Sequence, residues 1–414
     1  MLRIGSLFWL VACGAPEAEP SDPKPPTSTE APNLDADRVR ALIAGTADLD
    51  ETLMAVAWSG GWPVRTDEGT WIFVAVSDAD DVALSGDFNG WAPAPMTPGE
   101  GFHWLEIGVA QPEGLGYKFT SGAAELEADP WARSYTHDAF GSLSYVAPPL
   151  DDWHLERWPK AEFGVLEARD LRVYVPPGAG PWPTVYAHDG QNLFDPAATW
   201  GGWRLQEALD GLPDLLVVGI DNTSARMDEY THVADILEPG GALYGGQAED
   251  YAAALRDGIR PHIEQVYGEP SASAVMGSSL GGLVSLFIAA EQPGQWDMAI
   301  SLSGTLGWGR FGLDNPTIQE WTLGAGPDAV LYLDSGGDSG VDGVCTDPDG
   351  DGFTEDDPES SDNYCTTRQM ADALGASGWV WNADLYHWHE PGALHNEAAW
   401  AGRVERPLGI FAGL

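Results

Sequence analysis

Basic residues are scarce in this sequence: 19 lysines and arginines stand against 64 aspartates and glutamates, which gives a formal net charge of −45. A chain with this charge repels the phosphates of nucleic acids and anionic membrane surfaces, so neither is expected as a partner. We attribute the acidic surplus to solubility in a salty or extracellular setting. A glycine-rich phosphate loop with its lysine is also lacking, so no nucleotide or redox cofactor is predicted.

Long apolar runs are lacking at the N-terminus, where residues 4–12 are too few to span a bilayer. Residues 1–12 are typical of a signal peptide, and "LVAC", ending at Cys13, resembles the lipobox of bacterial lipoproteins, whose cysteine is lipidated after cleavage. The alternative is an ordinary secretory signal. Residues 13–34 are rich in proline and acid and predict a flexible tether. We therefore expect a protein of the cell envelope or the extracellular space that meets a membrane only through its N-terminal lipid.

Cysteine is rare, with three residues in the chain. If Cys13 carries lipid, Cys345 and Cys365 remain as one pair, and in an oxidising compartment they would form a disulfide. Two buried free thiols are the alternative. Metal binding by these cysteines is not expected, because no third cysteine or nearby histidine completes a site.

A length of 414 residues exceeds one typical core, so two domains are expected. Residues 35–150 begin with two short helices and continue as short β-rich runs divided by Gly, Asn, Asp and Pro, which predicts a small β-sandwich. Residues 151–414 alternate apolar strands with helical stretches, the order that builds a mostly parallel sheet covered on both faces. The predicted fold class is α/β.

Three stretches of the first domain carry a resemblance: "VALSGDFNGW", "GYKF" and "ADPWARSY". They resemble the early-set, immunoglobulin-like domain related to glycogen-binding modules, which is also found in front of enterochelin-esterase-type hydrolases. The resemblance implies that Trp91, Trp104 and Trp131 can stack on sugar rings. Because aromatic residues usually fill cores, we favour a structural or substrate-shaping role for this domain.

The stretch "AVMGSSLGGL", residues 274–283, places a G-x-S-x-G motif at the end of a buried strand and the start of a helix. Such a strand-to-helix turn exposes the hydroxyl of its central serine, which is Ser279, and the flanking glycines tolerate the crowding. Ser278 is then a small spacer. The position predicts Ser279 as a nucleophile in an α/β-hydrolase fold.

A serine nucleophile needs a base, which in this fold follows the acid and lies near the last strand. Of three late histidines, His395 is the predicted base, while His387 and His389 line the cleft. Asp338, after the glycine pair of "LDSGGD", is the predicted acid, with Asp334 as its competitor.

An oxyanion hole requires two amide donors aimed at the carbonyl oxygen of the substrate. We expect one from Leu280, the residue after the nucleophile. The other is expected from Gln191 in the loop "AHDGQNLFDP".

Together, "VYAHDGQNLFD", "GSSLGGL", "LDSGGD" and "PGALHNEAAW" resemble, in this order, the esterase family that contains enterochelin esterases, feruloyl esterase domains and mycolyltransferase antigens. The resemblance implies a Ser279, Asp338 and His395 triad that hydrolyses a small-molecule or carbohydrate-linked carboxylic ester through an acyl-enzyme, with no cofactor required for catalysis. The alternatives are acyl transfer on the same triad and a noncatalytic carbohydrate-binding lipoprotein.

One segment departs from that family: residues 340–366 form an acidic insertion. Asp347, Asp349 and Asp351 repeat the oxygen spacing of the first half of an EF-hand loop, and Glu355 follows as a fourth ligand. The twelfth position is a proline rather than a glutamate, which excludes a full EF-hand. A structural Ca²⁺ ion and a solvated acidic hairpin are the two interpretations.

Overall fold

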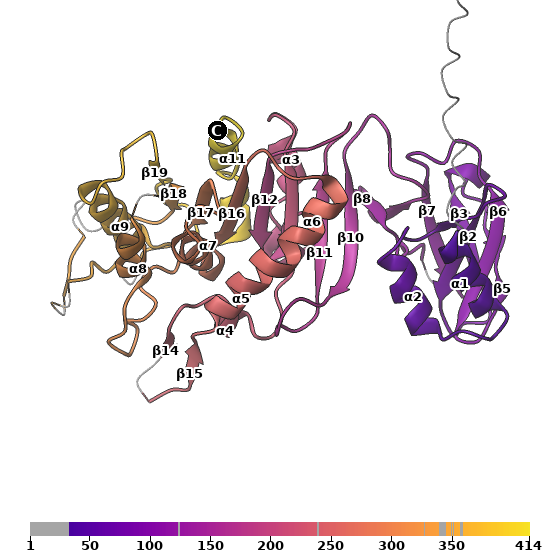
Figure 1. Ribbon diagram of the computed structural model, residues 1–414, viewed down its shortest axis with the longest axis horizontal. Helices are drawn as coiled ribbons and strands as arrows, with labels where there is room; N and C mark the ends of the chain where they lie inside the picture. The colour runs from indigo at the N-terminus through magenta and orange to yellow at the C-terminus, as the bar shows by residue number, and fades with distance from the viewer. Residues whose placement is uncertain are drawn as a thin grey trace, which may run out of the picture.

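The computed structural model describes residues 33–122, 125–237, 240–326, 328–338, 345–348, 350, 352–356 and 359–414. The predicted signal peptide, Cys13 and all but the last two residues of the predicted tether lie outside this range. The described chain forms two lobes, one N-terminal and one C-terminal (Figure 1). Within the described residues, no helix combines the length and apolar character needed to cross a membrane.

The N-terminal lobe opens with two short helices, α1 (Leu34–Ile43) and α2 (Leu49–Ala57). The side chains of Asn33 and Asp48 accept amide hydrogen bonds at their N-termini, which explains why each helix begins there. Both helices pack on an antiparallel sheet of the order β1-β2-β6-β5. Its strands are β1 (Val64–Arg65), β2 (Thr70–Val76), β6 (Phe102–Gly108) and β5 (Thr97–Pro98).

A second sheet faces the first, and buried side chains such as Phe73, Leu84 and Tyr117 fill the space between them. Within this lobe the second sheet contains β3 (Val82–Gly86), β4 (Ala94–Pro95), β7 (Gly116–Ser121), β8 (Ser134–Asp138) and β9 (Gly141–Tyr145). Two packed sheets with alternating inward residues agree with the predicted β-rich character of this region.

The second sheet does not end at the lobe boundary. It continues into the C-terminal lobe as one 13-stranded sheet of the order β19-β18-β17-β16-β12-β13-β11-β10-β8-β9-β7-β3-β4. The junction is the antiparallel pair of β10 and β8, in which Leu155 lies opposite Tyr135. Arg133 reinforces it: its guanidinium lies 3.4 Å from the ring centre of Trp158, and its Nη1 donates to the Arg157 carbonyl at 2.9 Å.

The C-terminal lobe has the predicted α/β architecture. Parallel pairing joins β13, β12, β16, β17, β18 and β19, whereas β11 and β10 are antiparallel. The strands are β10 (His154–Ala161), β11 (Arg169–Val175), β12 (Thr184–His188), β13 (Leu216–Ile220), β16 (Ser273–Ser278), β17 (Met298–Leu302), β18 (Val330–Ser335) and β19 (Leu385–His389). A separate hairpin contains β14 (Ala234–Ile236) and β15 (Leu243–Gly245).

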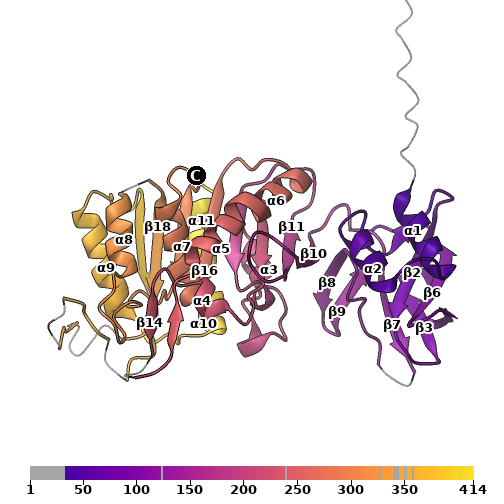
Figure 2. The ribbon, with the colours of Figure 1, turned by 60° about the horizontal axis from the view of Figure 1, so that its bottom comes forward.

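Helices cover both faces of this sheet (Figure 2). One core contains side chains of α5, α7, α8 and α9, and the opposite core contains side chains of α3, α10 and α11. Successive residues of β16 show the alternation, because Val275 belongs to the first core and Met276 to the second. The helices are α3 (Leu205–Leu209), α4 (Arg226–Glu229), α5 (Ala248–Ala254), α6 (Arg260–Tyr267), α7 (Leu280–Glu291), α8 (Ile318–Ala325), α9 (Tyr364–Ala376), α10 (Glu397–Ala401) and α11 (Glu405–Phe411).

Candidate active site

Ser279 lies in the turn between β16 and α7, at the carboxyl edge of the parallel strands. Its backbone has φ 56° and ψ −124°, a conformation that residues with a side chain rarely adopt. A Cβ on Gly277 would lie 2.6 Å from the backbone of Gly281, and one on Gly282 would lie 2.6 Å from Ser301 Oγ. Gly277 and Gly282 therefore permit the close contact between strand and helix that exposes Ser279 at the turn. Ser278, by contrast, is buried at the strand end.

His395, which lines a cavity together with Ser279, forms a polar pair with Asp362. His395 lies in the loop between β19 and α10, and its Nδ1 is 2.8 Å from Asp362 Oδ1. The side chain of Asp362 is fully buried, and its Oδ2 accepts hydrogen bonds from Ser303 Oγ at 2.5 Å and from the Gly336 amide at 2.7 Å. Burial raises the pKa of Asp362, but the hydrogen bonds from His395, Ser303 and Gly336 outweigh it and hold this pKa below its ordinary value. Asp362 is therefore an ionised acceptor, and His395 Nδ1 carries the proton.

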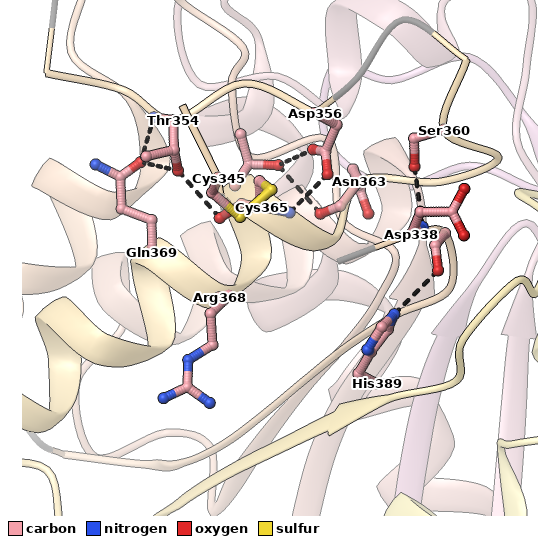
Figure 3. The surroundings of a disulfide bond; sticks show 12 residues. Asp338, Cys345, Thr354, Asp356, Ser360, Asn363, Cys365, Arg368, Gln369 and His389 are labelled. Atoms are coloured by element: carbon pink, nitrogen blue, oxygen red, sulfur yellow. Dashed lines mark hydrogen bonds between the residues drawn. A yellow bond between two sulfur atoms is a disulfide. The ribbon is translucent and has the colours of Figure 1, made fainter. Parts of the chain in front are cut away.

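This geometry corrects the sequence-based choice of Asp338 as the partner of His395. Asp338 is exposed, and its amide donates to Ser360 Oγ at 3.2 Å (Figure 3). The competitor, Asp334, is fully buried at the end of β18, where its Oδ1 lies 3.1 Å from Arg403 Nη2. Neither residue contacts His395 through any hydrogen bond or ion pair within the described part of the chain.

The glycine pair after β18 explains the error. Gly336 and Gly337 do not serve to turn Asp338 toward the site; they let two other segments approach the backbone closely. A Cβ on Gly336 would collide with the Ala393 carbonyl, and one on Gly337, where φ is 77°, would lie 2.7 Å from Ser360 Oγ. The His395 amide also donates to the Ser361 carbonyl at 3.0 Å, so the loops carrying the acid and the base pack directly on each other.

Sequence reasoning missed Asp362 because it placed the acid before the insertion. One signal was present: Asp362 is the last carboxylate before α9, one residue ahead of the Asn363 cap position. The insertion therefore separates strand β18 from its acid. Sequence reasoning also missed Ser303 and Arg403, whose side chains meet at 2.7 Å behind Asp362.

A cavity of about 230 Å³ brings Ser279 and His395 together. Trp203 and Trp400 contribute its apolar walls, and Arg226 and Asp189 its charges. The guanidinium of Arg226 makes two hydrogen bonds to the Asp189 carboxylate, at 2.7 and 2.8 Å. The hydroxyl oxygen of Ser279 also lies 3.3 Å from the hydroxyl oxygen of Thr305.

The two predicted oxyanion donors are adjacent in sequence to residues that line this cavity. Leu280 is the first residue of α7, so its amide has no acceptor one turn earlier within the helix. Gln191 belongs to a 3-10 turn of residues 190–192, between the cavity-lining residues Asp189 and Asn192. Its side-chain oxygen accepts from the Asn222 amide at 3.1 Å, which fixes the turn.

The other two late histidines are engaged elsewhere. His389, labelled in Figure 3, has its Nε2 3.0 Å from the Gly337 carbonyl. Its ring is 4.1 Å from that of Tyr364. Burial lowers the pKa of His387 to about 4, so this imidazole is neutral.

The described part of the insertion is tied to α9. A disulfide joins Cys345 to Cys365, in the first turn of that helix (Figure 3). Asp347 uses its carboxylate to accept the amides of Gly350 and Gly352, at 2.8 and 3.0 Å. Asp349 and Asp351 lie outside the described residues, and among those described no three metal-binding side chains gather. The calcium interpretation stays a prediction.

Comparisons with known proteins agree with this fold. The family model described as "Putative esterase" matches residues 166–406, more than half of the chain. The chain therefore belongs to this esterase family.

Two curated relatives match part of the chain. The uncharacterized protein YbbA of Bacillus subtilis is 32% identical over 145 residues, which cover 33% of this chain and 57% of that protein. The siderophore triacetylfusarinine C esterase of Aspergillus fumigatus is 28% identical over 138 residues, which cover 32% of this chain and 47% of that protein. The chain thus spans about half the length of the curated relatives it matches.

Among solved structures, the siderophore hydrolase EstA of Aspergillus nidulans has a TM-score of 0.47 and 16% identity, covering 63% of this chain and 94% of that one. The enterobactin esterase FES of Shigella flexneri has a TM-score of 0.44 and 15% identity, covering 83% of this chain and 92% of that one.

Proposed function

We propose that the protein is a serine hydrolase that cleaves carboxylic esters with Ser279 as nucleophile, His395 as base and Asp362 as acid. The observation that carries this proposal is the buried, ionised Asp362 on His395 Nδ1, with His395 and the strained Ser279 lining one cavity. Because Asp362 holds the proton on Nδ1, the other ring nitrogen, Nε2, is free to accept one.

The reaction follows from this proton arrangement. Ser279 Oγ attacks the ester carbon while its proton passes to His395 Nε2, and Asp362 stabilises the imidazolium that forms. His395 then gives this proton to the leaving alcohol oxygen as the carbon–oxygen bond breaks, which leaves an acyl group on Ser279. Water, activated by the same histidine, releases the acid and restores the serine.

The negative charge on the carbonyl oxygen needs preorganised donors. The amide of Leu280 is supported for this role by its place directly after the nucleophile at a helix N-terminus. The amide of Gln191 is supported by its place in the turn beside the cavity. No cofactor takes part in these steps.

We propose a small-molecule or carbohydrate-linked ester as substrate. The names of the relatives indicate siderophore esters for those proteins, but a net charge of −45 steers strongly anionic substrates away from this one. Feruloyl, acetyl-sugar and simple acyl esters therefore stand beside siderophore esters as candidates.

We also propose an early-set, immunoglobulin-like identity and a structural role for the N-terminal lobe. Trp104 and Trp131 pack against the core beneath α1 and α2, which supports this role over sugar stacking. Trp91 is more exposed, and its Nε1 donates to Asp87 at 2.9 Å. Binding of soluble glucans or xylans to the full chain would contradict it.

The proposed location is the cell envelope, with a lipid on Cys13. Cys13→Ser should then release the protein from membranes into the soluble fraction. Unchanged membrane association would argue against lipidation.

The catalytic proposal is tested by hydrolysis of an ester panel together with covalent labelling by a fluorophosphonate. Ser279→Ala should abolish both turnover and labelling, because no nucleophile remains. Ser278→Ala is the matched control and should retain most of both, since Ser278 is buried in the strand. Labelling that survives in Ser279→Ala would refute the assignment.

A further inference from the structure

A second and larger cavity, of about 480 Å³, also borders His395. Its residues come from the loop after β17, including Thr305 and Phe311, and from the end of the insertion, including Glu355 and Asp356. The Thr305 amide donates to the Ser279 carbonyl at 3.1 Å, so this cavity begins beside the nucleophile. A group attached to an ester at Ser279 can therefore extend past His395 into it.

The charge of this cavity is one-sided. Its described lining includes the acidic residues Glu355, Asp356 and Asp362 and neither lysine nor arginine, although the Asp362 carboxylate itself has no exposed surface. Asp362 is engaged by His395, and Asp356 accepts from the Cys365 amide at 2.6 Å (Figure 3). Glu355 is exposed and has no ion pair within the described chain, which leaves its carboxylate available.

The position of Glu355 is fixed by its backbone. Its amide donates to the Thr346 carbonyl at 2.9 Å, and the adjacent Cys345 is bonded to Cys365 in α9. The carboxylate is thus carried on a stapled hairpin rather than on a free loop.

The same cavity also has apolar lining residues. They include Leu306 and Phe311, and Phe311 is 48% exposed. An aromatic face attracts a cation, as a carboxylate does, while both disfavour an anion. The cavity volume lies within the range of small-ligand pockets.

We propose that this cavity holds a positively charged group of the ester substrate, of the alkylammonium class, and that Glu355 is the specificity residue that recognises its charge. This inference rests on the proposed ester hydrolysis at Ser279. It deepens that function by naming a substrate class.

The test uses two series of esters with matched size and different charge, because the charged group can belong to the acyl or the alcohol part. The acyl series contains p-nitrophenyl esters of 7,7-dimethyloctanoate, of 6-(trimethylammonio)hexanoate and of 6-sulfohexanoate. The alcohol series contains acetylcholine, 3,3-dimethylbutyl acetate and 3-sulfopropyl acetate. Assays contain a chelator, so that calcium does not occupy Glu355.

In at least one series the cationic ester should have the highest kcat/KM and the anionic ester the lowest. Glu355→Gln should reduce the ratio of cationic to neutral turnover by about 3-fold, the size expected for a partly screened charge pair, with the neutral ester unchanged. Glu355→Lys should reverse the order of cationic and anionic esters, a change of roughly 10-fold.

Asp338→Asn serves as the control that separates long-range attraction by the net charge from local recognition by Glu355. Asp338 is exposed and absent from the described lining of the cavity, and its loss changes the net charge by the same amount. This variant should keep the cationic preference of the wild type. If neither series shows a preference that depends on Glu355 while Ser279 still hydrolyses the neutral esters, the inference is overturned and the proposed function stands. If no ester is hydrolysed through Ser279, the proposed function fails first.

Discussion

Asp362→Asn changes one atom of the candidate site and should set the wrong tautomer of His395. In the native carboxylate, Oδ2 accepts from the Gly336 amide and from Ser303 Oγ, while Oδ1 accepts from His395 Nδ1 and from the Asn363 amide. The Gly336 amide and the Arg403 guanidinium, 3.7 Å away, can only donate at the Oδ2 position, and the Asn363 amide can only donate at Oδ1. The two donors at Oδ2 favour the asparagine oxygen there, and the Asn363 amide loses its acceptor. The asparagine NH₂ then faces His395 Nδ1 and donates to it. The histidine proton moves to Nε2, where it blocks acceptance of the Ser279 proton.

The expected loss in kcat is about 10⁴-fold, the size that follows when the acid of such a triad becomes an amide with its geometry retained. This corresponds to about 5 kcal/mol of transition-state stabilisation. The assay is steady-state hydrolysis of a p-nitrophenyl ester, with the rate of fluorophosphonate labelling as a second readout. KM should change little, because Asp362 is buried behind the histidine and its side chain has no exposed surface.

Two aspartates provide the comparison. Asp338→Asn should keep wild-type kcat, since its side chain is exposed. Asp334→Asn should lose stability more than rate, because Arg403 then has no close buried carboxylate other than Asp362, at 3.7 Å. A loss below 10-fold in folded Asp362→Asn, or a larger loss in Asp338→Asn, would refute the assignment of the acid.

Removing the disulfide by replacing Cys345 and Cys365 with alanine should lower the free energy of unfolding by about 3 kcal/mol, the chain-entropy value for a separation of 20 residues, measured by urea denaturation against the oxidised wild type. Calcium should raise the melting temperature if the insertion binds it, because a ligand of the folded state stabilises that state; no shift at millimolar calcium, with magnesium as control, would leave the loop as acidic surface. Burial raises the pKa of Asp129 to about 6, so the folded state keeps a proton that the unfolded state loses near pH 4. The contribution of this group to the free energy of unfolding, about 3 kcal/mol, is therefore lost as pH rises from 4 to 6. Asp129→Asn should remove that part of the pH dependence of unfolding. Arg133→Ala should lower the free energy of unfolding by about 3 kcal/mol, because its hydrogen bond and its ring stacking are lost, and should split thermal unfolding into two transitions. Arg133→Lys should be intermediate. A single transition at the wild-type temperature would argue against a role of Arg133 at the lobe junction.

The alternating order of strands and helices in the C-terminal lobe and two of the three candidate catalytic residues could be inferred from local patterns. The turn at Ser279 is encoded within ten residues, because the glycines that it needs are adjacent in sequence. His395 could be selected by its position after the last strand. Local sequence could not indicate that β10 pairs with β8, since that pairing joins strands from different lobes and depends on register.

The acid could not be located from the strand alone. Distance along the chain constrains distance in space only when the connection is short, and the insertion removes that constraint between β18 and Asp362. The strand-end carboxylate, Asp334, is instead paired with Arg403: burial raises its pKa to about 6, while the guanidinium opposes this rise. A pattern search that expects a carboxylate near the strand end therefore finds a buried structural residue.

In the proposed function, one short segment of the insertion carries both the acid and the specificity residue. Glu355 on the larger cavity and Asp362 on His395 are seven residues apart, and both lie between the start of the insertion and α9. The disulfide between Cys345 and Cys365 closes this same segment against the helix. A change that loosens the hairpin should therefore affect substrate preference before it affects the chemical step, because Asp362 is additionally held by buried hydrogen bonds whereas Glu355 is held only by its backbone.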